Sequence, residues 1–142
     1  MFKNILTAID LTEESSWVKS IPTAVEFCQS AGARLHLMTV IPDFGMSIVS
    51  QYFPKDYAEK ALEGARAELN AFASKHIPDD VQPTLVIAQG TIYEEIIRVG
   101  NEVSADLIIV ASHRPSLKDY LLGPNAARVV RHANCSVMVV RE

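Results

Sequence analysis

Cysteine is scarce in this chain of 142 residues, which contains only Cys28 and Cys135. The first residues, from Met1 to Leu6, enter a strand-like pattern directly, so we find no signal peptide. A chain with two cysteines and no such signal is expected in the reducing cytoplasm. We therefore interpret both cysteines as small buried thiols rather than as reactive groups.

Long apolar runs and runs of positive charge are also missing. No apolar stretch reaches the ~18 residues of a membrane span, so the chain is not expected to be embedded in a membrane. The net charge is −4 and the sequence has no run of Lys and Arg. This charge balance argues against nucleic acid as a main partner.

Residue sets that would carry metal or hydrolytic chemistry are equally hard to find. No spacing of His and Cys suggests zinc, and no metal site is predicted. Ser112 and His113 are neighbours in sequence, but an organised base would need a third partner, so no catalytic residue is assigned. The sequence favours a binding module over a metabolic enzyme.

Strand-like and helix-like segments alternate along the chain, which is typical of one α/β domain over residues 1–142. The predicted strands are 4–9, 33–41, 84–88, 107–111 and 136–140. The predicted helices are about 20–31, 55–76, 92–103 and 124–132. Right-handed crossovers then favour an open, parallel, five-stranded sheet with helices on both faces, and we expect the Rossmann-like, flavodoxin-like strand order 3-2-1-4-5.

Capping residues and apolar periodicity give the expected details of the helices. Ser20 is the expected N-cap of the first helix, Pro22 lies in its first turn, and Gly32 ends it. The helix at 55–76 is expected to bury one stripe and the helix at 92–103 another. These inward-facing residues are Ala58, Leu62, Ala65, Leu69 and Phe72, and Ile92, Ile96, Val99 and Val103.

The stretch from Asp106 to His132 contains the clearest functional pattern. Its apolar run 107–110 suits a parallel strand buried on both faces, and a loop then leads to a helix that begins at Gly123-Pro124. In the expected strand order, Asp10 and the loop 111–125 face each other across one cleft, where such sheets bind ligands. The amides of a helix N-terminus favour phosphate there, although an ordinary surface crossover explains the same residues.

The chain resembles the universal stress protein family over nearly its whole length. Ile-Leu-Thr-Ala-Ile-Asp-Leu at 5–11 looks like the family's first strand, which ends in an acidic residue at the adenosine site, and Leu-His-Leu-Met-Thr-Val-Ile at 35–41 resembles its second strand. The closing segment 121–141 is the most specific part. ATP-binding members carry Gly-x2-Gly-x9-Gly-(Ser/Thr) in the loop that leads into this segment, and their loop and helix N-terminus wrap the phosphates.

The resemblance implies a site for ATP, with or without Mg²⁺. Asp10 would hold ribose or adenine, and backbone groups of Val40 would read adenine. The other residues of the implied site would form the base pocket and the phosphate loop. They are Ala8, Ile9 and Gly90 at the base, and Ala111, Ser112, His113, Arg114, Gly123, Pro124 and Asn125 along the phosphates.

The phosphate loop of this chain is a variant of the family pattern. Ala111 and Arg114 stand for the first two glycines, the segment to Gly123 is one residue shorter, and Pro124 replaces the Ser/Thr and removes an N–H donor. Side-chain donors at 112–114 and at Asn125 compensate, and Arg can grip phosphate with two parallel hydrogen bonds.

Three functions follow from these patterns. The first is an ATP-binding universal stress protein that acts as a nucleotide-linked regulatory module, in which ATP orders the loop 111–125 and changes the affinity for an unidentified protein partner. The second is a slow ATPase or nucleotidyl-transfer enzyme. The third is a nucleotide-free dimerisation module.

The apolar loop 42–54 either folds over its own domain or serves as a partner surface or nucleotide lid.

The last strand is expected to mediate self-association. Residues Ser136 to Val140 lie at a sheet edge in the expected order, and they carry no Pro or Lys that would block pairing. Antiparallel pairing across a two-fold axis would give a homodimer, and the family resemblance points the same way. The loop 42–54 could add a second interface and produce a tetramer.

Overall fold

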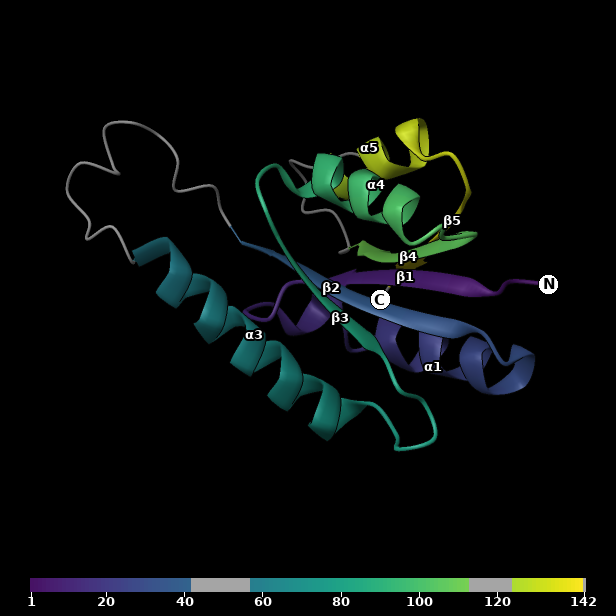
Figure 1. Ribbon diagram of the computed structural model, residues 1–142. Coiled ribbons are helices and arrows are strands. Elements are labelled where there is room, and N and C mark those ends of the chain that lie inside the picture. The colour runs from purple at the N-terminus through teal and green to yellow at the C-terminus, as the bar shows by residue number, and fades with distance from the viewer. Residues whose placement is uncertain (42–56, 113–123, 142) are drawn as a thin grey trace.

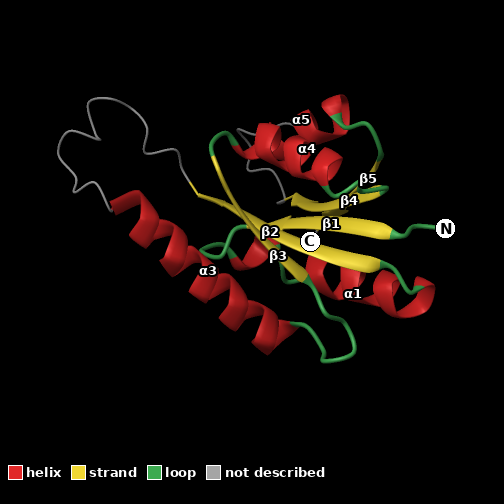
Figure 2. Ribbon diagram, viewed as in Figure 1, coloured by secondary structure: helices red, strands yellow, loops and turns green. Residues whose placement is uncertain are grey.

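The computed structural model describes residues 1–41, 57–112 and 124–141 (Figure 1). Five parallel strands form one sheet in the order β3-β2-β1-β4-β5, which confirms the predicted fold and strand order. Figure 2 shows the strands in yellow between two sets of red helices. The strands are β1 (Asn4–Ile9), β2 (Arg34–Ile41), β3 (Thr84–Gln89), β4 (Leu107–Ser112) and β5 (Ser136–Arg141). The helices are η1 (Glu14–Ser16), α1 (Ser20–Ala31), α3 (Tyr57–His76), α4 (Ile92–Glu102) and α5 (Pro124–His132).

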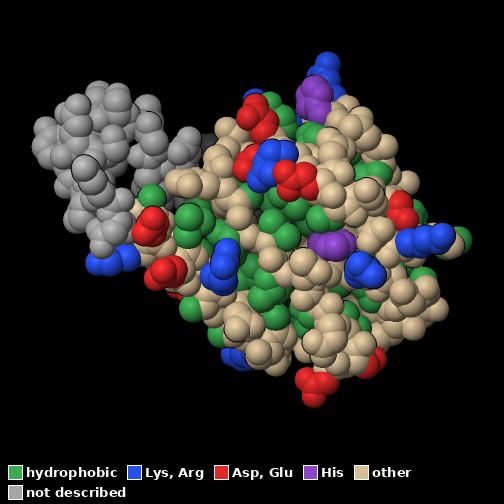
Figure 3. Space-filling view, in the orientation of Figure 1, with side chains coloured by type: hydrophobic (Ala, Val, Ile, Leu, Met, Phe, Trp, Pro, Cys, Tyr) green, Lys and Arg blue, Asp and Glu red, His purple; other side chains and the backbone are tan. Residues whose placement is uncertain are grey.

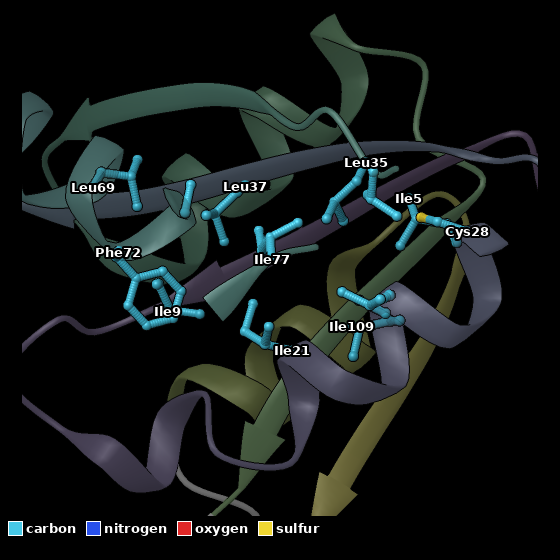
Figure 4. Close-up of a cluster of buried hydrophobic side chains, with 14 of the residues drawn as sticks. Ile5, Ile9, Ile21, Cys28, Leu35, Leu37, Leu69, Phe72, Ile77 and Ile109 are labelled. Carbon is cyan, nitrogen blue, oxygen red and sulfur yellow. The ribbon is translucent and has the colours of Figure 1, made fainter. Parts of the chain in front are cut away.

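Two hydrophobic cores sandwich the sheet, one on each face. Alternate residues of β1 divide between them: Ile5 belongs to the core under α1 and α3, and Leu6 to the core under α4 and α5. Figure 4 shows the first core, where Leu37 and Ile109 of the strands meet Ile21 of α1. Burial on both faces explains why the strand sequences are nearly continuous apolar runs rather than alternating ones.

The start of α1 differs from its prediction, because Lys19 rather than Ser20 is the N-cap. Ser20 is the first helical residue and is fully buried, and its hydroxyl donates to the Ser16 carbonyl at 2.9 Å. The turn η1 before the helix supplies backbone acceptors, so no side-chain cap is needed; the N–H of Ile21 donates to Trp17 O at 3.1 Å. The predicted end at Gly32 is confirmed, with φ +67°.

The predicted inner faces of α3 and α4 are only partly correct. Leu69 and Phe72 are buried, whereas the first three turns of α3 extend past the sheet and bury no residue fully. Ile96 and Val99 of α4 are buried, but Ile92, the first helical residue, is 43% exposed and lies at the carboxyl edge of the sheet. Amphipathic periodicity identifies a face but not the length over which the sheet covers it.

The described residues contain no helix that is both long and apolar enough for a membrane crossing. On the face shown in Figure 3, Lys and Arg side chains are interspersed with Asp and Glu over the coloured part of the surface.

His36 is a buried histidine in β2 with one unused nitrogen. His36 is only 7% exposed, and its Nε2 lies 3.3 Å from Asn4 Oδ1. Its Nδ1 has no hydrogen-bond partner among the described residues. Burial, and then the charge of Arg34, lower the pKa of His36. The imidazole of His36 therefore binds its second ring proton less readily in the folded state than in the unfolded state.

His36 should make the protein less stable in mild acid. Because the folded pKa lies below the unfolded value of about 6.5, the free energy of unfolding should fall as the pH drops below that value and recover at neutral pH. Denaturant titrations at several pH values should show this slope, and His36→Gln should flatten it. The exposed His132→Gln is the matched control, and an unchanged slope in H36Q would rule out His36 as the cause.

Candidate functional site

A cleft of about 510 Å³ opens at the carboxyl edge of the sheet, where β1 and β4 lie side by side. The chain leaves β1 toward β2 on one side and leaves β4 toward β5 on the other, so the crossovers diverge at this point. The ends of three strands form its floor, and α3, α4 and α5 form its walls. The described lining residues are 8–13, 39–41, 110–112 and 124–126, with Ser16, Ala65, Glu68, Ile92 and Ile96.

Asp10 lies at the centre of this edge and is held by its own turn. Its Oδ1 accepts the backbone N–H of Thr12 at 2.9 Å and the Thr12 hydroxyl at 2.7 Å. The N–H of Asp10 donates to Ser16 Oγ at 2.9 Å, so the backbone on both sides of the carboxylate is fixed. From the described residues Oδ2 accepts no hydrogen bond, which leaves that oxygen as an acceptor for a ligand hydroxyl or amine.

The floor of the cleft is largely apolar, and buried threonines near it bond to the backbone of the neighbouring strands. The buried Thr39 donates its hydroxyl to Ile9 O at 2.9 Å, and Thr7 donates to Ile109 O at 3.0 Å. These two bonds tie β1 to its neighbours β2 and β4. Val40 and Ile41 continue the apolar surface, which suits a flat heterocycle better than a strongly hydrated ligand.

The two ends of the cleft differ in electrostatic character. The N-terminus of α5 lies at the β4 end, where its first turn, Pro124 to Ala126, lines the cleft. The N–H groups of a first helical turn have no partner within the helix. Pro124 is the first residue of that helix and contributes no donor. Carboxylates of Asp10, Glu13 and Glu68 lie on the other walls. The cleft thus combines an anion-accepting helix end with acceptor oxygens.

Eight of the twelve predicted site residues line this one cleft, namely Ala8, Ile9, Asp10, Val40, Ala111, Ser112, Pro124 and Asn125. His113, Arg114 and Gly123 lie outside the described residues. Gly90 does not line the cleft. It turns the chain from β3 to α4 at φ +137°, and its N–H donates to Ile41 O at 3.2 Å, so it ties the ends of β3 and β2 together.

The prediction missed the walls that come from helices. Thr39 and Ile41 flank the predicted Val40, so the end of β2 was a usable signal for them. Ala65 and Glu68 belong to α3, and the sequence contains no signal that brings this helix to the cleft. Their position depends on how α3 packs against β2 and β3.

Cysteine and metal chemistry have little support in the described residues. Burial raises the pKa of the Cys28 thiol, and burial together with the charge of Asp106 raises that of Cys135. Neutral thiols are poor nucleophiles and poor ligands. Within residues 1–41, 57–112 and 124–141, no group of three or more His, Cys, Asp or Glu could hold a metal ion.

Comparison with known proteins gives matches along the whole chain. Universal stress protein G of Escherichia coli O157:H7 is 30% identical over 144 residues, which cover 99% of this chain and all of that protein. Universal stress protein UspA from Lactobacillus plantarum shares the fold, with a TM-score of 0.66, 23% identity and coverage of 98% and 97%. A universal stress protein solved in complex with cAMP has a TM-score of 0.62, 20% identity and coverage of 99% and 97%.

The family model provides the broadest match. The model of the Universal stress protein family covers residues 1–141, and therefore includes every strand that forms the cleft. The 30% identity to Universal stress protein G over 99% of this chain agrees with the family match. This chain belongs to the universal stress protein family.

Proposed function

We propose that this chain is an ATP-binding regulatory module of the stress response, with the nucleotide in the cleft between β1 and β4. One observation carries the proposal: Asp10 and the N-terminus of α5 line the same cleft at the point where the crossovers diverge. A carboxylate acceptor and a helix N-terminus in one apolar cleft match a ligand that joins a donor-rich nucleoside to an anionic phosphate.

The nucleotide is proposed to lie across the strand ends. Ala8, Ile9 and Val40 would form the base pocket, and Asp10 would accept a hydrogen bond from ribose or adenine. Ala111, Ser112 and Asn125 would follow the phosphates toward α5. His113, Arg114 and Gly123 belong to the same proposal on sequence grounds, as Arg114 supplies the positive charge that the described walls lack.

The ligand class has support at the family level, because one solved relative was obtained in complex with cAMP. Both cAMP and ATP contain an adenine, a ribose and at least one phosphate. A Mg²⁺ ion that accompanies ATP would be carried mainly by the phosphates, given that the described residues offer no ready set of metal ligands.

Regulation is proposed to follow from loop ordering. Residues 42–56 and 113–123 connect β2 to α3 and β4 to α5, so both segments adjoin elements that line the cleft. A nucleotide that binds one arrangement of these segments better than another would shift the protein toward it and change the affinity for a protein partner. Both segments lie outside the described residues, so this step rests on the sequence alone.

Nucleotide released from the purified protein is the most direct test. Mass spectrometry after denaturation should detect ATP in the wild-type sample and little in Asp10→Ala, because that change removes a charged acceptor worth about ten-fold in affinity. The matched control is Asp79→Asn, an exposed carboxylate in the turn between α3 and β3, which should retain the wild-type amount.

The same spectrum separates the rival functions. ADP as the only nucleotide would favour a slow ATPase and would require single-turnover hydrolysis assays. No nucleotide in the wild-type sample, followed by no adenosine or ATP binding in titrations, would contradict the proposal and leave a nucleotide-free dimerisation module.

Pro124 gives a second test of the phosphate end. Pro124→Ser restores the backbone N–H and adds a hydroxyl at the start of α5, so ATP affinity should stay the same or rise modestly. Titration calorimetry with ATP measures this, with Val130→Ser on the exposed side of α5 as the control. A large loss of ATP affinity would show that the fixed φ of proline shapes the site, and that the lost donor matters little.

Self-association through β5 is the structural part of the proposal. β5 pairs with β4 on one side only and stands at the sheet edge, and its residues 137–140 are half-buried on both faces. Its side chains pack against both cores, so the strand is firmly placed, and no other described strand pairs with its outer edge. Antiparallel pairing of two copies would produce a homodimer, and a tetramer would need a further surface.

A proline in β5 should split the dimer. Met138→Pro removes a ladder N–H and should convert dimers to monomers at micromolar concentration, with some loss of monomer stability. Met138→Leu keeps the N–H and an apolar side chain and should remain dimeric. Light scattering measures both variants, and a monomeric wild type would refute the edge-strand dimer.

A further inference from the structure

The long helix α3 contributes a wall of the cleft that the sequence did not reveal. Ala65 and Glu68 line the cleft together with the strand ends. We infer that Glu68 is a base-selecting residue, whose carboxylate accepts a hydrogen bond from the exocyclic amine of adenine. This inference rests on the proposed nucleotide site and adds a specificity determinant to it.

Glu68 occupies the part of α3 that is fixed to the domain. Leu69, the next residue, is fully buried, and Phe72 is 8% exposed in the same core. Trp17 packs edge-on against Phe72 with ring centroids 5.1 Å apart and lies 4.5 Å from the His76 ring. Trp17 directly follows the Asp10–Ser16 turn that lines the cleft, so this aromatic contact fixes α3 relative to Asp10.

The packing of the helices places Glu68 at the end of the cleft away from α5. α3 contacts β2 and β3, whereas α5 contacts β4 and β5. Along the sheet edge, β1 and Asp10 lie between β2 and β4. Two strand spacings separate β2 from β4, which is about 10 Å. A nucleotide with its phosphates at α5 therefore presents its base to β2 and α3.

The Glu68 carboxylate is available for a ligand. No hydrogen bond or ion pair engages it within the described part of the chain, whereas Asp10 Oδ1 already accepts two bonds from Thr12. An ionised carboxylate can only accept hydrogen bonds. Adenine presents an amine at its 6-position. Hypoxanthine presents a carbonyl oxygen there, which a carboxylate repels, and has its N–H donor at position 1 instead. A site built around such an acceptor rejects the analogue that lacks the donor.

Adenosine and inosine, which differ at this position, test the inference without any contribution from phosphate. Titration calorimetry should show that the wild-type protein binds adenosine more tightly than inosine. Glu68→Gln supplies a donor as well as an acceptor, so it should reduce this preference about five-fold, the scale of one partly exposed hydrogen bond. Glu63→Gln, an exposed position of α3 outside the cleft lining, should keep the wild-type preference.

The outcomes distinguish this inference from the proposed function. Adenosine binding with the same preference in E68Q, or an equal change for both nucleosides, would overturn the role of Glu68 and leave the nucleotide site in place. Stronger ATP binding by E68Q with an unchanged nucleoside preference would show that Glu68 acts only as a repelling charge, and would overturn the inference too. No nucleoside binding by the wild type would remove both proposals.

Discussion

Burial of the central strands on both faces is the constraint on which the rest of the structure depends. Ile5 and Leu6 of β1 enter opposite cores, and so do Ile108 and Ile109 of β4. Strands buried in this way are parallel and are joined by helical crossovers, so all their carboxyl ends reach one edge of the sheet. Polar residues that follow the strands therefore meet at that edge, although they are far apart in sequence.

The two edges of the sheet use their carboxylates differently. At the amino edge, Asp106 accepts the N–H groups of Lys3 and Asn4 at 2.8 and 3.1 Å, and so joins the starts of β4 and β1. At the carboxyl edge, Asp10 is held by its own turn through one oxygen. The first arrangement uses both oxygens for structure, whereas the second leaves acceptor capacity in a cleft. This contrast is the reason to propose Asp10, and not Asp106, as a binding residue.

The helix α3 is packed more tightly in its C-terminal half than in its first turns, and the cleft wall lies where the two parts meet. The C-terminal half of α3 is fixed by Leu69, Phe72 and the ring of Trp17, while its first three turns bury no residue fully. The cleft wall at Glu68 lies at the boundary between these parts. A ligand that touches the Asp10 turn and α3 together would bridge two elements that Trp17 already couples.

The sequence by itself indicated the strands and the helices, because apolar runs and the Gly32 and Pro124 boundaries are local signals. The right-handed rule for crossovers then left few strand orders, and the expected one is the order observed. The sequence also brought Asp10, Val40 and Ala111 to one edge, since each follows or ends a strand. Only the tertiary structure decided that Gly90 serves the turn after β3, and that Ala65 and Glu68 form a wall. The angle and length over which a helix covers a sheet depend on contacts between distant residues, and helical periodicity contains no information about them.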